Sequence, residues 1–294
     1  MSATPFDRLA VRRHRDRAAA AFDNHDFLFR EVAERLADRL DDVRGRFPLA
    51  LDLGCRTGIV SQALQGHGGI ETIVGSELSE AMARRAPRPV VVADDEALPF
   101  ADQAFDLVVS CGALHWTNDL PGALVQVRRA LKPDGLFLAA FSGGETLAHL
   151  RQVMIEAELA VLDGASPRVS PVVDTRDAGM LLQRAGFALP VVDSDVLSVT
   201  YPDTLAMMRD LRGMGETNAN AERQRHFTRR AVIADAAARL AVQQGRDDGR
   251  VEMRIQVLFV TAWAPAPSQP KALRPGSAKA RLADALDAVE TTLE

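Results

Sequence analysis

Between Leu49 and about Leu162, short continuous apolar runs alternate with segments whose apolar residues recur at helical spacing. Such runs are typical of strands in a parallel sheet that helices cover on both faces. We predict strands at 49–53, 71–77, 89–93, 105–111 and 135–141. Helical patterns begin between or after them near Ile59, Ser79, Asp119 and Glu145. The alternation predicts a doubly wound α/β sheet.

The flanking segments have other patterns. From about Asp7 to Arg44, apolar residues recur every three to five positions among charges, which predicts two helices, the second capped by Asp23 or Asn24. After the alternating region we predict a helix at 175–185, a strand ending near Tyr201, helices at 203–213 and 228–243, a strand at 251–263, and a tail with a candidate short helix at 280–293.

These patterns divide the chain into five parts. We predict a helical cap at 1–45, a core at 46–200, a helical insert or lid at 201–249, the last core strand at 250–264 and a tail at 265–294. Met207, Met208 and Met214 lie in the insert at helical spacing, which is more often a core pattern than a recognition surface, and here some of it can be both.

The composition narrows the class of protein. The chain has 294 residues, 47% of them hydrophobic, and no apolar run long enough to cross a bilayer. Its net charge of −5 argues against general nucleic-acid binding, which needs a basic surface. Two cysteines, Cys55 and Cys111, are too few for a disulfide framework and suit a reducing compartment, so we expect a cytoplasmic protein.

Acidic residues follow or end the first three predicted strands. Asp52 precedes a turn at 54–58 that holds Gly54 and Gly58, Glu77 ends the second strand, and 94–95 is Asp-Asp after the third. Ligands of open α/β sheets bind outside the carboxyl ends of the strands, so we expect these groups to meet at one site.

Each group has a physical role at such a site. The turn lets backbone N–H groups approach a ligand, and the following helix adds a positive dipole end. A carboxylate after the second strand can accept both hydroxyls of a ribose, and one after the third can accept from the amine of adenine. Three acids would repel a pyrophosphate but tolerate a neutral nucleoside carrying a positive sulfonium. Neither G-x-G-x-x-G nor a P-loop occurs in the chain.

The motifs DLGCRTG, GSELSEAM, DDEALPFADQAFDLVVSCGALHW and LKPDG fall in this order. Over residues 49 to about 141 the chain resembles the class I S-adenosylmethionine (SAM) methyltransferases. The resemblance implies a Rossmann-like sheet of seven strands, whose last, antiparallel strand is 251–263, with a helical cap and insert and with SAM as cofactor. It implies as cofactor-binding residues Asp52, Gly54, Gly58, Glu77, Leu78, Asp94, Asp95 and Cys111.

Segments outside this core carry a narrower resemblance. FDRLAVRRHRDRAAAAFDNHDFLFREVAERL, FSGGETLAHLRQVMIEAE and SQPKALRPGSAKARLADAL resemble bacterial relatives of a mitochondrial complex I assembly factor, a protein arginine hydroxylase that acts on an iron–sulfur subunit of complex I. The ALHW segment is also similar to the malonyl-acyl-carrier methyltransferase of biotin synthesis. The resemblance implies an iron–sulfur subunit of complex I, or another protein or small-molecule acceptor, as the partner.

Several single residues have two interpretations. His115 follows the fourth strand, where a neutral imidazole would accept a proton from a methyl acceptor, or its ring packs on the core. His14 and Asp16 have the spacing of an iron ligand pair, but positions i and i+2 do not share a helix face, so we expect no metal site. Cys55 and Cys111 are expected to pack as small apolar side chains rather than act as redox groups.

Arg56 stands where a D-x-G-x-G-x-G pattern has its central glycine. A left-handed backbone there costs arginine on the order of 1–2 kcal/mol, which the turn can tolerate. We predict that the Arg56 side chain turns outward or toward the cofactor rim and that SAM still binds. The arginine-rich first helix either caps the cofactor or presents a solvated face.

The leading hypothesis for the function is methyl transfer from SAM to an acceptor. The alternatives are a SAM-binding arginine hydroxylase and a non-catalytic factor, both in complex I assembly.

Overall fold

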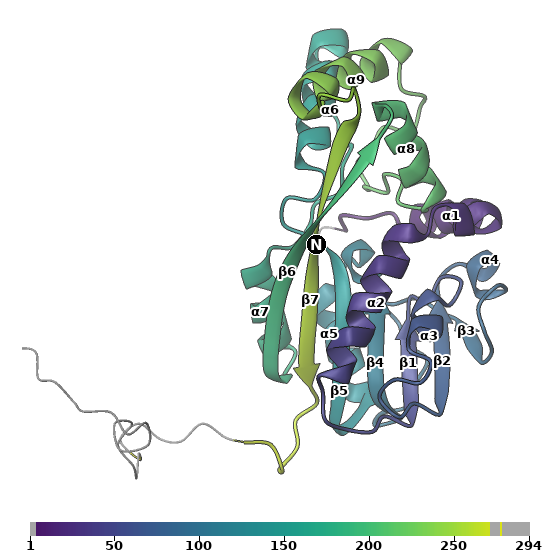
Figure 1. Cartoon of the computed structure of the whole chain (residues 1–294), viewed down its shortest axis with the longest axis vertical. Helices are drawn as coiled ribbons and strands as arrows, with labels where there is room; N and C mark the ends of the chain where they lie inside the picture. The colour runs from purple at the N-terminus through teal and green to yellow at the C-terminus, as the bar shows by residue number, and fades with distance from the viewer. Residues whose placement is uncertain (1–3, 271–276, 278–294) are drawn as a thin grey trace, which may run out of the picture.

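The computed structural model describes residues 4–270 and 277, and the candidate helix at 280–293 lies outside them. Seven strands form one sheet in the order β3-β2-β1-β4-β5-β7-β6 (Figure 1). Their bounds are β1 Leu49–Leu53, β2 Thr72–Glu77, β3 Val90–Val92, β4 Phe105–Cys111, β5 Leu131–Gly143, β6 Ala188–Tyr201 and β7 Val251–Trp263. The first five strands pair in parallel, and β7 is antiparallel to both β5 and β6. The predicted α/β sheet with an antiparallel strand at 251–263 is confirmed.

Helices cover both faces of the sheet because its central strands are apolar on both sides. On β1, Ala50 packs into one core cluster and Leu51 into the other. The first cluster contains α2 (Phe27–Asp41) and α3 (Ile59–Ala63). The second contains α5 (Leu120–Ala130) and α7 (Thr175–Arg184). This two-sided burial explains why the strands read as continuous apolar runs.

The N-terminal cap consists of α1 (Arg8–Ala18), the 3-10 helix η1 (Ala19–Asn24) and α2. The prediction that Asp23 or Asn24 caps the second helix is wrong, because the alanine-rich residues after α1 continue as η1 and α2 begins only at Phe27. Asp26, which precedes α2, makes no capping bond. Its carboxylate pairs with Arg30 at 2.6 Å instead.

Three helices lie beyond the carboxyl ends of the strands, and we call them the lid: α6 (Ala148–Leu162), α8 (Thr204–Gly213) and α9 (Arg230–Gln244) (Figure 1). The long strands β6 and β7 reach up to this layer (Figure 1). Met207 and Met214 are buried in the lid's core, and Met208 lines a pocket beneath it. The methionines therefore belong partly to the core and partly to the lining of a pocket.

Two short elements complete the carboxyl edge of the sheet, α4 (Glu80–Ala83) and the 3-10 helix η2 (Leu114–Trp116). The predicted helix starts at Ser79 and Asp119 are confirmed, since each side chain accepts a hydrogen bond from the backbone N–H three residues on. Among the described residues, every helix is too short or too polar to cross a membrane.

Candidate functional site

The turn after β1 needs glycine at two positions. Gly54 has φ +73° and Gly58 has φ +87°, both in the left-handed region that side chains disfavour. Space is also short, because a Cβ on Gly54 would lie 2.2 Å from the Cβ of Ala113 and one on Gly58 would lie 2.3 Å from the Cδ of Pro87. The turn is therefore packed tightly against the loops that follow β2 and β4.

Arg56 has φ +51°, so it bears the left-handed strain foreseen for this position. Its side chain is only 2% exposed, so the predicted outward turn is wrong, whereas the alternative turn toward the cofactor rim stays a prediction. The guanidinium donates to the carbonyl oxygens of Gly112 at 2.9 Å and Met214 at 3.3 Å, pairs with Glu216, and lies 4.1 Å above the Phe29 ring. These partners join the glycine turn to the segment after α8, although burial lowers the pKa of Arg56.

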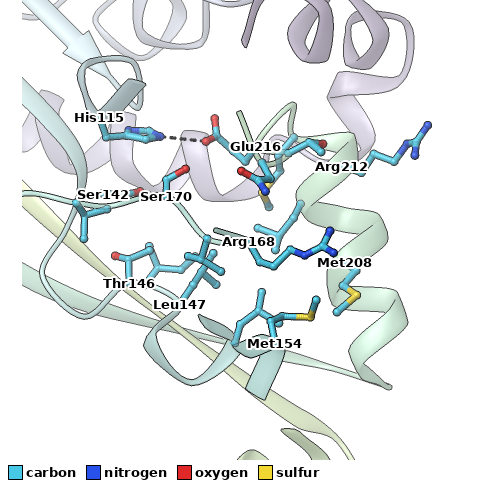
Figure 2. A pocket seen from close by; sticks show the side chains of 18 of the residues that line it. His115, Ser142, Thr146, Leu147, Met154, Arg168, Ser170, Met208, Arg212 and Glu216 are labelled. Atoms are coloured by element: carbon cyan, nitrogen blue, oxygen red, sulfur yellow. Dashed lines mark hydrogen bonds and ion pairs between the residues drawn. The ribbon is translucent and has the colours of Figure 1, made fainter. Parts of the chain in front are cut away.

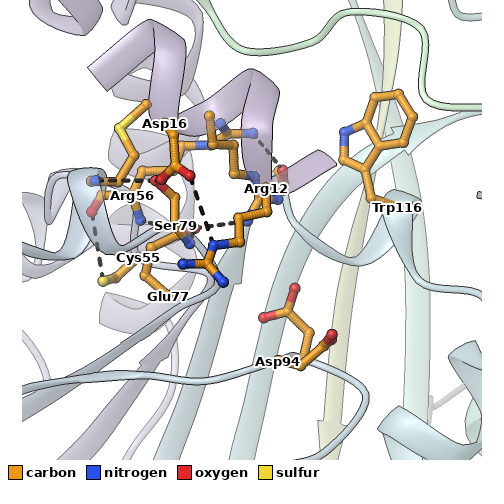
Figure 3. Close-up of polar contacts among 12 residues, drawn as sticks. Arg12, Asp16, Cys55, Arg56, Glu77, Ser79, Asp94 and Trp116 are labelled. Atoms are coloured by element: carbon orange, nitrogen blue, oxygen red, sulfur yellow. Dashed lines mark hydrogen bonds and ion pairs between the residues drawn. The ribbon is translucent and has the colours of Figure 1, made fainter. Parts of the chain in front are cut away.

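Glu77 at the end of β2 is fully buried, and both of its carboxylate oxygens accept hydrogen bonds (Figure 3). One carboxylate oxygen accepts from the Arg15 guanidinium at 3.0 Å and the Ser79 N–H at 2.8 Å, and the other accepts from the Arg56 N–H at 2.9 Å. Burial opposes ionisation, but Arg15 and these N–H groups hold the pKa of Glu77 below its ordinary value. Arg15, itself 0% exposed, therefore binds the carboxylate that we expected to bind a ribose.

Asp94 and Asp95 follow β3 and are also held by α1. Arg8 donates to Asp94 at 2.5 Å and to Asp95 at 3.3 Å, and it reaches the Trp116 carbonyl oxygen at 3.1 Å. Leu78 packs in the small cluster formed by the start of α1 and Trp116. Arg8 therefore covers these acids directly, while Arg12 and Arg13 on the same helix are exposed. That α1 caps a bound cofactor stays a prediction.

Asp52 lies beneath the turn and is 1% exposed. One of its oxygens accepts from the N–H and the hydroxyl of Ser61, at 3.2 and 2.9 Å, which ties β1 to α3. Burial raises its pKa to about 7. Burial also raises the pKa of the Cys55 thiol well above its ordinary value and that of Cys111 to about 12, as expected for thiols that pack rather than react.

Several buried polar atoms at this edge of the sheet have no hydrogen-bond partner among the described residues. They are Asp52 Oδ1, Ser76 Oγ, Asp95 Oδ1, His115 Nδ1 and Thr117 Oγ1, together with the guanidinium nitrogens Arg15 Nε, Arg15 Nη2 and Arg56 Nε. Buried polar groups without partners are costly and are candidates for contacts with a ligand. Together with the acids of three adjacent strands, they suit a nucleoside that carries a positive charge.

His14 and Asp16 point to different partners, as expected for positions two apart on a helix. His14 Nδ1 lies 3.0 Å from the Thr217 carbonyl oxygen, whereas Asp16 accepts from the Ser79 hydroxyl at 2.6 Å (Figure 3). The part of the chain that the structure describes holds no group of three or more His, Cys, Asp or Glu side chains placed to bind a metal ion.

A pocket of about 450 Å³ lies between the lid and the carboxyl ends of β4 and β5, and we call it the lid pocket (Figure 2). Most of its wall is apolar, from Leu147, Met154 and Met208 among others. Its polar lining residues include His115 and Glu216, which lie side by side. Glu216 also pairs with Arg56, so one carboxylate touches both the glycine turn and the lid pocket.

Sequence reasoning missed Glu216 and the specific roles of Arg8 and Arg15. Glu216 lies 160 positions from Arg56 and 101 from His115, and no local pattern joins residues at such separations. Its only local signal is an acid after the buried Met214 and Gly215, directly beyond a predicted helix. The arginines of the first helix were visible as a charge run but not as partners of particular acids.

Comparisons with known proteins agree with this geometry. A family model described as a methyltransferase domain matches residues 51–139. Arginine-hydroxylase NDUFAF5, mitochondrial, of Danio rerio is 42% identical over 286 residues, which cover 95% of this chain and 88% of that protein. Malonyl-[acyl-carrier protein] O-methyltransferase of Methylovorus sp. (strain MP688) is 34% identical over 273 residues, 88% of this chain and 90% of that protein.

The crystal structure of the YcgJ protein from Bacillus subtilis shares the fold, with a TM-score of 0.56 at 15% identity over 80% of this chain and 99% of that one. The sheet order and the domain match define the class: the chain is a class I SAM-dependent methyltransferase. Within that class it belongs to the family that contains the NDUFAF5 arginine hydroxylases and the malonyl-[acyl-carrier protein] O-methyltransferases.

The first prediction concerns the pH dependence of stability. The pKa of Asp52 in the folded protein, about 7, exceeds its ordinary value of 3.8, so folding takes up a proton between these values. The stability that Asp52 contributes is therefore full below about pH 4 and is lost as the pH rises to about 7. Asp52→Asn should gain unfolding free energy relative to wild type across this range, measured by urea denaturation. Asp102→Asn, the same change at an exposed acid, serves as control. A pH-independent difference for Asp52→Asn would contradict the assignment.

The second prediction concerns Arg56→Gly. Glycine relieves the left-handed strain, about 1–2 kcal/mol. It also removes the cation that pairs with Glu216, whose side chain is only 16% exposed. Leaving a buried charge unpaired in this way costs about 3–5 kcal/mol. We expect a net loss of about 1–4 kcal/mol in the unfolding free energy, from urea denaturation. The loss should shrink in Arg56→Gly/Glu216→Gln, which no longer buries the unpaired charge. A glycine variant more stable than wild type would show that strain outweighs the ion pair.

Proposed function

We propose that this protein transfers the methyl group of SAM to an acceptor bound in the lid pocket. The observation that carries the proposal is the adjacency of two sites: buried acids at the ends of β1, β2 and β3, and a largely apolar pocket that meets them at Glu216. Methyl transfer is an in-line displacement that needs donor and acceptor held in contact more than it needs acid–base groups. Two adjoining compartments suit such a reaction.

The cofactor site in this proposal uses the residues at the carboxyl edge of the sheet. SAM supplies a methyl group activated by a sulfonium charge. Glu77 would accept from the ribose hydroxyls, and Asp94 and Asp95 would border the adenine. The remaining residues would surround the methionine end or pack beside the nucleoside: Asp52, Gly54, Gly58, Leu78 and Cys111.

A ribose that binds at Glu77 would have to share this carboxylate with Arg15 or displace it. Both oxygens of Glu77 already have donors, and neither Glu77 nor Arg15 is exposed. In the described conformation α1 therefore covers the acid that the proposal assigns to the ribose, and Arg15 competes with the cofactor for it. When a binding-competent state is only partly populated, the apparent affinity falls by that fraction.

This competition gives a third prediction. Arg15→Ala removes the competing cation, and Glu77 keeps its two backbone donors, so SAM should bind about ten-fold or more tightly by calorimetry. Arg13→Ala, an exposed arginine on the same helix, should bind SAM like wild type. Weaker binding in Arg15→Ala, in a protein that melts at the temperature of wild type, would instead make Arg15 a direct contact of the cofactor.

A second candidate function is arginine hydroxylation in the assembly of respiratory complex I, with an iron–sulfur subunit as partner. It is supported by the relatives named arginine hydroxylases, whose matches cover 93% to 95% of this chain in the vertebrate examples. A third candidate is an assembly factor that binds SAM without turnover. The two unpaired thiols, Cys55 and Cys111, favour a reducing, cytoplasmic location for any of these roles.

Mass spectrometry of the complex I iron–sulfur subunit, with and without this gene, separates the candidates, and this is the fourth prediction. A gene-dependent gain of one methylene on that subunit supports methylation, and a gain of one oxygen supports hydroxylation. Restoring the gene with Arg13→Ala should restore the modification, which controls for expression. If the subunit's mass is the same in both strains, methylation and hydroxylation of that target are both excluded.

A further inference from the structure

The imidazole of His115 is oriented by a buried carboxylate. Its Nε2 lies 3.0 Å from one oxygen of Glu216, which also accepts from the Trp116 indole N–H at 2.7 Å. Burial opposes ionisation of Glu216, but His115 and Arg56 hold the pKa of Glu216 well below its ordinary value. An ionised carboxylate can only accept hydrogen bonds. Nε2 therefore carries a proton in its pair with Glu216, and in the neutral form of the ring the lone pair lies on Nδ1.

The second ring nitrogen has no such partner. Nδ1 of His115 is buried and makes no hydrogen bond to any residue in the described part of the chain. The side chain is 7% exposed and lines the lid pocket, beside Glu216 (Figure 2). A buried acceptor atom without a donor is costly in a finished core. In a residue that lines a pocket, such an atom can accept a proton from a molecule bound there.

The charges around the lid pocket do not suit an anionic guest. Arg168 lines the pocket, but its guanidinium is bound to Glu158, which is itself buried. Arg212 contributes its stem while its head points away from the pocket (Figure 2). Glu216 adds negative charge, offset by Arg56. A carboxylate acceptor would therefore meet no cation aimed at it within the described residues.

We propose that His115 is the general base of this enzyme and that its acceptor reacts through a nitrogen or hydroxyl oxygen that carries a proton, rather than through a carboxylate. This inference rests on the methyl transfer proposed above. A carboxylate is already ionised near neutral pH and needs no base, whereas an amine, amide or hydroxyl must lose a proton as it is methylated. The Glu216–His115 pair has the arrangement that such proton removal requires, a base oriented by a third group.

A lone pair on the acceptor atom forms the bond to the methyl carbon, and the carbon–sulfur bond breaks with its electron pair left on sulfur. The proton of the acceptor atom passes to His115 Nδ1. The resulting imidazolium carries protons on both nitrogens, and Glu216 stabilises it through the Nε2–H bond. Glu216 is thus a positioning residue, since it acts on the acceptor only through His115.

The orientation of the ring can be tested without any acceptor. Two-dimensional NMR of protein labelled with ¹⁵N-histidine reads which nitrogen carries the proton, and the signals of His115 are those lost in His115→Gln. We expect the Nε2–H form in wild type and a mixture of both forms in Glu216→Gln. A merely structural role of Glu216 would leave the ratio of forms unchanged. An Nδ1–H ring in wild type would overturn the proposal.

The acceptor class is tested with methyl-labelled SAM and a cell lysate, followed by mild alkali, and this is the fifth prediction. Methyl esters release volatile methanol under alkali, whereas methyl groups on nitrogen or ether oxygen stay bound. We expect an alkali-stable label whose rate of transfer falls about 100-fold in His115→Ala and is partly restored by added imidazole. His149→Ala, an exposed histidine of α6, should transfer at the wild-type rate.

Each other outcome has a distinct meaning. An alkali-labile label would overturn the acceptor class while methyl transfer stands. A stable label with an unchanged rate in His115→Ala or His115→Gln, both binding SAM as wild type does, would overturn the role of His115. If wild type binds SAM but labels nothing, methyl transfer itself fails and this proposal with it.

Discussion

The structure depends on how buried acids at one edge of the sheet are neutralised. Glu77 and Asp95 are fully buried and Glu216 is largely so, and an uncompensated charge in such surroundings is among the costliest features a protein can contain. Three arginines from two separate parts of the chain neutralise these acids: Arg8 and Arg15 from α1, and Arg56 from the glycine turn. The cap, the turn and the lid are held together at the point where these charges meet.

This arrangement explains why an arginine occupies a position that favours glycine. The backbone strain at Arg56 is of the order of 1–2 kcal/mol. A buried ion pair, two carbonyl contacts and an aromatic ring beneath the guanidinium oppose this strain. The loop is therefore specialised rather than damaged. Its backbone can still approach a ligand through Gly54 and Gly58, while its side chain secures the segment after α8.

The sequence was sufficient for the sheet because the apolar runs and the caps are local signals. β1, β4 and β7 have the predicted bounds, since a run of buried residues fixes a strand by itself. The cap of α2 was misplaced because the alanines after Ala18 can continue a helix or end it, and only the packing of η1 decides. The sequence could place the acids at one edge of the sheet because they follow or end strands. It could not predict their cationic partners, because ion pairs such as Arg56–Glu216 join positions 160 apart.

Glu216 touches the turn through Arg56 and the lid pocket through His115, and this contact has a thermodynamic consequence. Any shift of Glu216 that one ligand induces must alter the free energy of binding the other. Linkage requires the two effects to be equal, so a cofactor that favours the acceptor is favoured by the acceptor to the same degree. A single carboxylate can in this way make the two compartments cooperative, without a rigid-body movement of the sheet.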